Sequence, residues 1–411
     1  MAEKKLKPGW RKVKFGDVVR LSKARCADPL AEGVERFVGL EHLEPGDLRI
    51  RTWGDVADGV TFTSVFKPGQ VLFGKRRAYQ RKVAVADFSG VCSGDIYVLE
   101  SQDANVLMPE LLPFICQTDA FFDHAVGTSA GSLSPRTNWT SLADFDFVLP
   151  PMDAQKAIAA VMAGIEETHQ SLIEAERAGK LLYRSAIDDF FVSGIQSKSI
   201  LLDRNSTAAS GWRILTGEKM LQQGILLALQ DGNHGSQYPR SEELGDTGMP
   251  YISASDISED GEIDLSGVRR LTEGRARALR IPPALPGDVV LTHNATVGRV
   301  TVLPEWETAI VASTSTTYYR VAEKELMASI LASYMRSSVF KSQLATYMRQ
   351  STRNQVPITT QQKLIFLVPP RKEQAAFDTK LNEIWSTYRS IKRRINVNAC
   401  VRKSFAQEYL Q

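Results

Sequence analysis

The sequence has no long apolar runs. None approaches the roughly 18 residues that a membrane-spanning helix needs. The N-terminal segment, Met-Ala-Glu-Lys-Lys-Leu-Lys-Pro-Gly-Trp, is charged and has no apolar stretch behind it, unlike a secretory signal. Because 43% of the residues are apolar and 24% are charged, and because both of these segments are missing, we expect a globular protein of the cytoplasm.

Cysteine and histidine are also scarce. The four cysteines (Cys26, Cys92, Cys116 and Cys400) form no Cys-x-x-Cys pair, and the five histidines show no His-x-x-x-His spacing. Disulfide frameworks and zinc sites depend on such spacings. We expect free, buried thiols and no metal site.

Motifs for cofactors and catalysis are missing as well. The chain has no Gly-x-x-x-x-Gly-Lys-Ser/Thr loop and no Asn-Pro-Pro-Tyr or Asp-Pro-Pro-Tyr sequence. The segment Gly127–Ser132 is rich in glycine but has no lysine after it, and the pairs Pro150-Pro151 and Pro369-Pro370 each follow an apolar residue. We therefore expect no catalytic residues and no cofactor in this chain.

Positive charge is concentrated in two stretches, although the net charge of the 411 residues is only +3. Between Arg336 and Lys363 there is no Asp or Glu, and the basic residues there are Arg336, Lys341, Arg349, Arg353 and Lys363. The second stretch holds Lys75, Arg76, Arg77, Arg81 and Lys82. Such patches contact phosphates in nucleic-acid-binding proteins, and the alternative is a solvated surface.

The chain repeats itself. Gly9-Trp10-Arg11 recurs as Gly211-Trp212-Arg213 at an offset of 202, and Pro68-Gly69 recurs as Pro286-Gly287 at 218. Leu149-Pro150-Pro151 with Gln155 recurs as Val368-Pro369-Pro370 with Gln374 at 219, an offset that Ser185 and Ser404 keep. One part of the repeat therefore tolerates insertions, whereas the part after the double proline does not.

Each segment after a double proline has the apolar spacing of a long helix. Two such stripes of equal length favour helices that pack on each other as an antiparallel coiled coil. The expected interface residues are Ile158, Ile165, Leu172 and Leu182 in the first helix, and Leu381, Ile384, Ile391 and Phe405 in the second. Proline lacks the amide donor that a first helical turn leaves unused, so the Pro-Pro pairs suit the helix starts.

The rest of each repeat reads as a mixed α/β domain. Strands are predicted near Gln70–Phe73, Ile96–Leu99, Asp288–Leu291 and Thr317–Val321, and helical segments near Pro109–Asp123 and Lys324–Tyr347. The predicted boundaries are a first domain at 1–150, a helix at 151–192, a linker at 193–210, a second domain at 211–368 and a second helix at 369–411.

Taken together, these motifs resemble the specificity subunits of type I restriction-modification systems. The resemblance rests on the Gly-Trp start, the Pro-Gly-Gln/Asp-Val-Leu/Val strand and the Leu/Val-Pro-Pro-x-x-x-Gln helix, each occurring twice, and on the segments "FVGLEHLEPGDLRI" and "LQDGNHGSQYP". It covers essentially the whole chain.

The resemblance implies a non-enzymatic reader of double-stranded DNA with two target-recognition domains. It implies two adenine-N6 methyltransferase subunits that use S-adenosylmethionine, and restriction subunits that use ATP and Mg²⁺, as partners. A type II-like system with a fused nuclease-methyltransferase partner, a diverged DNA methyltransferase, and a coiled-coil adaptor remain as alternatives.

Candidate DNA-contacting side chains lie in five strips. Arginine pairs with guanine and asparagine with adenine, whereas lysine serves phosphate. The candidates are Lys75, Arg76, Arg77, Arg81 and Lys82; Ser132 and Arg136; His234; His293, Asn294 and Arg299; and Arg349, Arg353 and Asn354. Because these strips differ between repeats, we expect a bipartite, asymmetric site. A helix of about 40 residues spans about 60 Å, so unread base pairs would separate the two halves.

Overall fold

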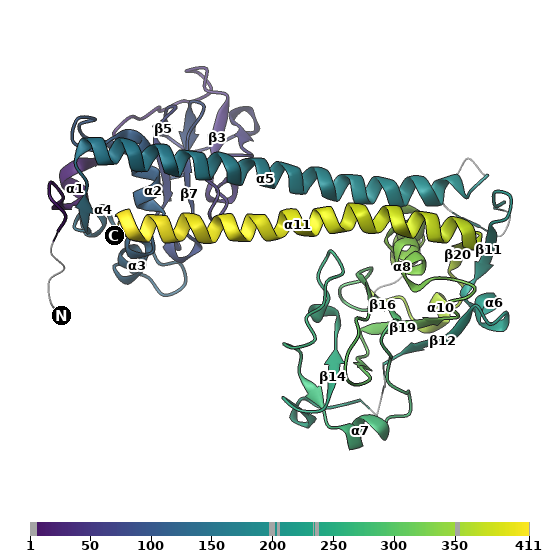
Figure 1. Cartoon of the computed structure of the whole chain (residues 1–411). Coiled ribbons are helices and arrows are strands. Elements are labelled where there is room, and N and C mark those ends of the chain that lie inside the picture. Colours follow the sequence, from purple (N-terminus) through teal and green to yellow (C-terminus); the bar gives the residue numbers. More distant parts are fainter. Residues whose placement is uncertain are drawn as a thin grey trace. The chain divides into compact units, whose positions relative to one another are not determined.

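The computed structural model describes residues 6–196, 202–203, 206–232, 234, 238–349 and 354–410. The chain forms two compact units, Met1–Glu174 with Lys392–Gln411 and Ala175–Ile391. The two boundaries between these units fall inside the long helices α5 (Met152–Ser193) and α11 (Arg371–Leu410), which Figure 1 shows. Each unit thus contains one globular domain and a segment of both helices.

Unit 1 contains three small sheets and four short helices. Its strands, in sheet order, are β1 (Arg11–Lys14) with β10 (Asp146–Leu149); β2 (Val19–Leu21), β9 (Ile96–Ser101), β6 (Val71–Gly74) and β7 (Val83–Val85); and β4 (Gly54–Asp55), β3 (Arg36–Val38), β8 (Gly90–Cys92) and β5 (Ser64–Phe66). Its helices are α1 (Phe15–Val18), α2 (Leu112–Cys116), α3 (Asp119–Gly127) and α4 (Trp139–Ala143), with 3-10 turns η1 (Leu40–His42), η2 (Val56–Asp58), η3 (Ala78–Gln80) and η4 (Pro109–Leu111).

Unit 2 repeats this plan. Its strands are β11 (Arg213–Thr216) with β20 (Ile365–Val368); β12 (Leu226–Asp231), β19 (Thr316–Val321), β16 (Val289–Thr292) and β17 (Val300–Val302); and β13 (Leu244–Gly245), β15 (Arg270–Leu271), β14 (Met249–Ile252) and β18 (Val311–Ala312). Its helices are α6 (Gly217–Gln222), α7 (Glu273–Arg277), α8 (Ala328–Arg336), α9 (Ser338–Arg349) and α10 (Ile358–Gln361), with 3-10 turns η6 (Ser241–Glu243) and η7 (Ala254–Asp256). The predicted strands and helical segments, and the mixed α/β class, are confirmed.

The repeated motifs form one joint at the start of each long helix. The Gln155 side chain is buried; its amide donates to the carbonyls of Val106 and Pro150, and its oxygen accepts from the Met108 amide at 2.9 Å. Gln374 makes the same three bonds to Glu325, Pro369 and Met327. A glutamine whose polar atoms are satisfied in this way ties the helix to the loop before η4 or α8. This joint explains why no insertion separates the double proline from the glutamine.

The long helices belong to the cores of both domains. In unit 1, Ile158 and Met162 of α5 pack into the cluster around Phe15 and Phe121. In unit 2, Phe377 of α11 stacks on Phe190 of α5 with ring centroids 3.9 Å apart. Burying one such side chain contributes roughly 1.5–3 kcal/mol. In each unit, α5 and α11 lie side by side and antiparallel (Figure 1), as expected.

The predicted seam of α5 is wrong at one residue. Ile158 and Leu172 are buried and Ile165 is half-buried, but Leu182 is 57% exposed. Its neighbour Tyr183 instead packs on Trp385 of α11, with ring centroids 4.9 Å apart. Counted from Ile158, alternating steps of three and four residues reach Leu182, whereas steps of four and three reach Tyr183. Within the run Leu181-Leu182-Tyr183 both positions carry apolar or aromatic side chains, so the sequence does not decide between the two seams.

The predicted seam of α11 lies on its buried face. Leu381 is buried, and Ile384, Ile391 and Phe405 are half-buried. The segment predicted to be a linker is tied down where it is described, because Ile195 pairs with Ala208 and the Ala209 amide donates to Gly194.

Membrane-spanning helices and clusters of metal ligands are both absent from the described residues. No helix in these ranges is long and apolar enough to cross a membrane. No group of three or more His, Cys, Asp or Glu side chains there is placed to hold a metal ion.

Candidate nucleic-acid interface

Two separately predicted strips meet in unit 1. The basic strip after β6 and the glycine-rich loop after α3 form an isolated β-bridge between Arg76 and Arg136. The Arg77 amide donates to the Pro135 carbonyl at 2.7 Å, and the Thr137 amide donates to Lys75 at 3.1 Å. The two loops are therefore one surface rather than two.

The corresponding strips meet in unit 2 in the same way. Asn294 forms a bridge with Gln355, and the Ala295 amide donates to the Asn354 carbonyl at 3.0 Å. The Val356 amide donates to His293 at 2.9 Å. Arg349 is the exposed last residue of α9, whereas Arg353 lies outside the described residues.

The backbone of both loop pairs is held in an unfavourable conformation at one equivalent residue. Arg77 has φ of 52° and Ala295 has φ of 61°, and in the described parts of the chain Arg81 is the one other non-glycine residue with positive φ. The left-handed region costs a residue with a Cβ about 1–2 kcal/mol, and such strain is common at functional sites. The repeat thus preserves a strained loop pair at the place where the two sequences differ most in charge.

A shared carboxylate organises the arginines of unit 1. Asp95 accepts from Arg136 Nε at 2.8 Å and from Arg76 Nη1 at 3.2 Å. The Arg136 hydrogen bond is the main reason that the pKa of Asp95 lies below its usual value. The Ser134 hydroxyl accepts from Arg76 at 3.0 Å and from Arg77 at 3.3 Å. One carboxylate among three guanidiniums leaves a net positive surface whose donors are already oriented.

The sequence missed two exposed side chains on this surface. Leu133, at the loop tip beside the exposed Ser132, is 90% exposed, and Tyr79 of the basic strip is 55% exposed. Apolar wedges and aromatic rings contact bases in many DNA complexes. The sequence features that could have indicated these two candidates are an aromatic residue among basic ones and a leucine between serines.

Two of the predicted basic contacts face their own domain. Arg81 donates to Asp119 at 2.7 Å and lies over the Phe122 ring at 4.5 Å. Lys82 Nζ donates to the Leu40 carbonyl at 2.6 Å. Among the described residues, the contact of the Lys75 Nζ is with the Tyr97 ring, at 4.7 Å. Arg81 and Lys82 are thus engaged within their own domain, as Arg76 and Arg136 are through Asp95, and all five remain predicted contacts.

The prediction for His293 requires a correction. Its side chain is fully buried, and neither ring nitrogen has a hydrogen-bond partner among the described residues. Burial lowers the pKa of His293, which favours the neutral ring. A buried neutral ring does not contact DNA, and sequence alignment with Lys75 could not show this. The His293 backbone is held on both sides, by hydrogen bonds with Ser315 and Val356.

The other unit 2 candidates differ in exposure and in partners. Asn294 is half-buried beside the strained Ala295, and Arg299 donates to the Ile257 carbonyl at 2.7 Å. His234 is exposed, with Nε2 3.1 Å from the Asp231 carboxylate. Asn294 and His234 therefore remain candidates, while Arg299 supports the loop after η7.

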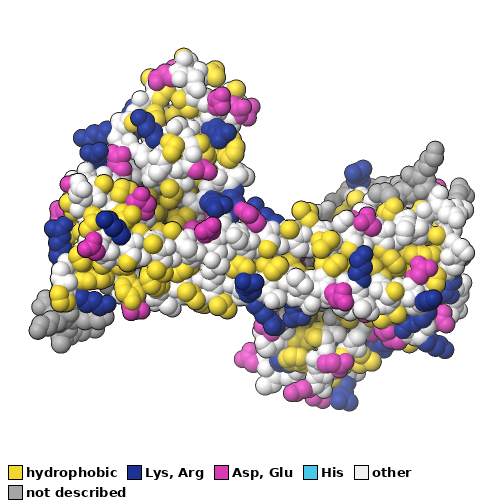
Figure 2. Space-filling view, turned by 45° about the horizontal axis from the view of Figure 1, so that its top comes forward, with side chains coloured by type: hydrophobic (Ala, Val, Ile, Leu, Met, Phe, Trp, Pro, Cys, Tyr) yellow, Lys and Arg dark blue, Asp and Glu magenta, His cyan; other side chains and the backbone are white. Residues whose placement is uncertain are grey.

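On the face that Figure 2 shows, Lys and Arg side chains are scattered among Asp and Glu, as the net charge of +3 leads one to expect. The paired loops supply local guanidinium, ammonium and amide donors for a nucleic-acid contact.

Two similar domains, each with a paired loop and each packed on a pair of long helices, define a duplicated binding protein. No family model matches the chain. In sequence it is 27% identical over 210 residues to the type I restriction enzyme EcoDI specificity subunit of Escherichia coli. This match covers 43% of the chain and 46% of that relative, or about half of its length. The resemblance found in the motifs is thereby confirmed.

Solved structures share the fold over the whole chain. A chain from a study of complex assembly and conformational transition of the type I R-M system has a TM-score of 0.58 and 18% identity. The S subunit of a type I restriction-modification system from M. genitalium has a TM-score of 0.57 and 14% identity. In both cases the match covers 99% of this chain and 98% of the other.

Proposed function

We propose that this chain is the DNA-binding specificity subunit of a type I restriction-modification complex. It recognises a bipartite, asymmetric site, one half with each paired loop, and positions adenine-N6 methyltransferase and restriction subunits. The observation that carries the proposal is the equivalent strained loop pair in both units, with Arg76 and Arg77 in one and Asn294 in the other. The sequence match to a specificity subunit and the shared fold support it.

The proposal assigns no catalysis to this chain. S-adenosylmethionine, ATP and Mg²⁺ would be bound by the partner subunits, and each chain would serve two methyltransferase subunits. The support is the missing phosphate-loop and methyltransferase motifs. We expect the purified chain alone to show no methylation, DNA cleavage or ATP hydrolysis.

The test is co-expression of the chain with its methyltransferase partner, followed by methylome sequencing. We expect adenine methylation at one split motif with two unequal halves. A palindromic or continuous motif, or turnover by the chain alone, would overturn the proposal. Omitting the nuclease polypeptide separates the type I assignment from a fused nuclease-methyltransferase partner. In a type I system methylation proceeds without that polypeptide, whereas with a fused partner its omission removes the methyltransferase as well.

A further inference from the structure

Both domains contact the long helices through one equivalent loop, here called the docking loop. In unit 1 it runs from 43 to 51, after η1, and in unit 2 from 257 to 263, after η7. Gly46 and Gly261 have φ of +80° and +79° at matching places in these loops. Both 3-10 turns are closed by their third residue, since His42 accepts from the Gly39 amide and Asp256 from the Ser253 amide. The two docking loops thus start from one backbone design.

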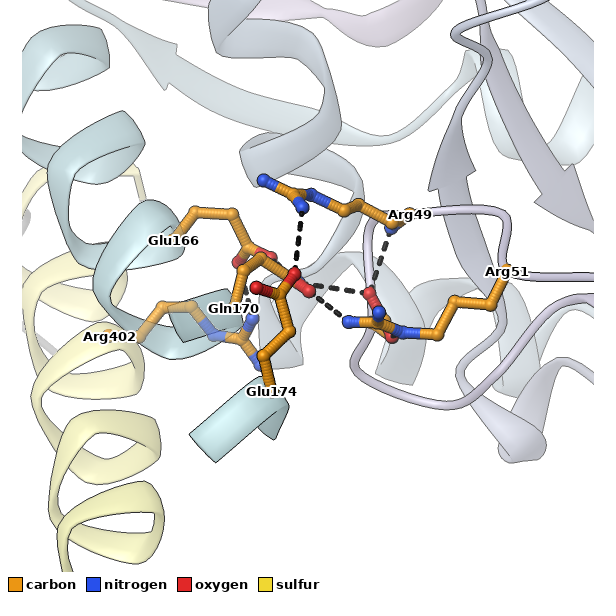
Figure 3. Close-up of polar contacts among 7 residues, drawn as sticks. Arg49, Arg51, Glu166, Gln170, Glu174 and Arg402 are labelled. Atoms are coloured by element: carbon orange, nitrogen blue, oxygen red, sulfur yellow. Dashed lines mark hydrogen bonds and ion pairs between the residues drawn. The ribbon is translucent and has the colours of Figure 1, made fainter. Parts of the chain in front are cut away.

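In unit 1, the docking loop meets α5 through a buried polar network (Figure 3). Arg51 donates to Asp47 at 2.5 Å and to the Gln170 side-chain oxygen. The Gln170 amide donates to Asp47 at 3.0 Å and to Glu166 at 2.5 Å. Burial alone would raise the pKa of Asp47, but hydrogen bonds from the Arg49 amide, Arg51 and Gln170 hold it below its usual value.

The network continues from α5 to α11. Glu166 accepts from Arg402 of α11 at 2.9 Å, and these side chains are only 12% and 15% exposed. At the edge of the network, Arg49 lies 3.6 Å from Glu174 (Figure 3). The docking loop of unit 1 therefore presents Arg49 to Glu174 and Arg51 to Gln170 of α5, while its own Asp47 accepts from Gln170. Buried charges of this kind are costly unless their partners are in place.

In unit 2, the polarity is reversed. Glu259 and Asp260 of the docking loop face Lys180 and Arg184 of α5, with Arg184–Glu259 at 3.0 Å and Lys180–Asp260 at 2.9 Å. Tyr388 of α11 donates to Asp260 at 3.0 Å. The loop is acidic here and the helix face is basic.

The helix residues at repeat-equivalent positions also differ in charge. At the offset of 219, Glu166 and Gln170 of α5 correspond to Trp385 and Arg389 of α11. The docking loop of unit 1, with Arg49 and Arg51, would find basic residues on the helix face of unit 2. Like charges at such distances repel, most strongly where solvent is excluded.

We propose that this opposite polarity assigns each globular domain to its own segment of the helix pair. Docking itself needs no DNA. Under the proposed function, on which this step rests, the assignment fixes the order and spacing of the two half-sites. Glu259, Asp260, Lys180 and Arg184 are then positioning residues, which determine specificity without touching a base.

The test is a cycle of charge reversals in unit 2. One variant carries Glu259→Lys and Asp260→Lys, another Lys180→Glu and Arg184→Glu, and the third carries all four changes. A matched control, Glu305→Lys with Glu307→Lys, makes the same charge change at two exposed sites of the same domain. Hydrogen exchange of the amides at 258–262 measures docking, and the amides at 43–51 report whether unit 1 stays folded.

We expect either half-reversal to speed exchange at 258–262 about tenfold or more, and the fourfold variant to return within about threefold of the native rate. The control should match the native chain. Native exchange in both half-reversals, or no recovery in the fourfold variant, would overturn the proposal. These outcomes do not depend on whether the chain binds DNA.

Methylome sequencing of the same variants tests the consequence for specificity. We expect the half-reversals to keep both half-site sequences but to accept several spacer lengths, and the fourfold variant to restore one length. Changed bases in a half-site would overturn the positioning role, since the docking loop would then contact DNA. A chain that directs no methylation even in its native form would contradict the proposed function instead.

Discussion

The two paired loops share a backbone and differ in side chains. At the strained position unit 1 has Arg77 and unit 2 has Ala295; one residue earlier they have Arg76 and Asn294. The bridges Arg76–Arg136 and Asn294–Gln355 hold both loops in the same way. The comparison shows how one backbone geometry carries two different sets of side chains: backbone hydrogen bonds fix the geometry, so the side chains are free to differ.

The largest expected effect comes from removing the pair of arginines that the loop of unit 1 has and the loop of unit 2 lacks. Arg76→Ala with Arg77→Ala takes away two oriented guanidiniums, and one good bidentate contact discriminates bases by about 1–3 kcal/mol. We expect methylation of the native site to fall by about 100-fold or more, with assembly of the subunits unchanged. Methylation of a site-bearing duplex measures the loss, and size-exclusion chromatography checks assembly. Normal methylation would mean that these arginines are solvated surface.

The buried glutamine at the start of each long helix is common to both units, so its removal should have equal effects in the two. Gln155→Ala and Gln374→Ala each leave buried backbone groups without their partner, which costs about 1–3 kcal/mol per group. We expect each variant to lower the free energy of unfolding by about 2–4 kcal/mol. Lys156→Ala, at the exposed neighbouring position, is the control. Denaturant unfolding measures all three, and a loss confined to one glutamine would show that the joints differ.

The helices should set the distance between half-sites. Four residues inserted after Ala175 lengthen α5 by about 5–6 Å, and base pairs rise about 3.4 Å each. We expect the spacer to grow by one or two base pairs while both half-sites stay the same. A matching insertion after Arg394 should improve tolerance by keeping the helix register. An unchanged spacer with full activity would show that the domains, not the helices, fix the distance.

The smallest effect concerns the buried histidine of unit 2. Burial lowers the pKa of His293 in the folded chain, with His234 acting in the same direction and Asp231 against it. The unfolded chain binds the proton at about pH 6.5. Below that pH the unfolded state therefore holds more protons, and stability falls as the pH falls. We expect His293→Gln to flatten this dependence in thermal unfolding between pH 7 and 5. An identical slope would place the titration elsewhere, first at His169, whose pKa burial also lowers.

Much of the architecture followed from the sequence. The duplication, the mixed α/β class and the two long helices were predicted from offsets and periodicity, because these patterns reflect local hydrogen bonding and a repeated apolar face. The stripe of α11 predicted its buried face. For α5 the same reasoning misplaced Leu182, since Leu181, Leu182 and Tyr183 offered alternative seams.

The candidate site was predicted less completely. The sequence placed the strips at Lys75–Lys82, Gly127–Arg136 and Thr292–Val300, but not their pairing, which joins loops far apart in the chain. It could not show that Arg81 binds Asp119, that Lys82 binds Leu40, or that His293 is buried. Each of these depends on a partner that only folding brings near.

The sequence by itself thus determined the repeat, the elements and the kinds of side chain in each strip, because local periodicity and composition fix these. The tertiary structure alone decided which polar groups face outward and which are used inside. Arginine and glutamine usually lie at protein surfaces, yet the packing of a loop on two helices buries Arg51, Gln170 and Arg402 together. The reason is physical: burial of a charged group depends on whether its partner arrives from another element, and no local pattern contains that partner.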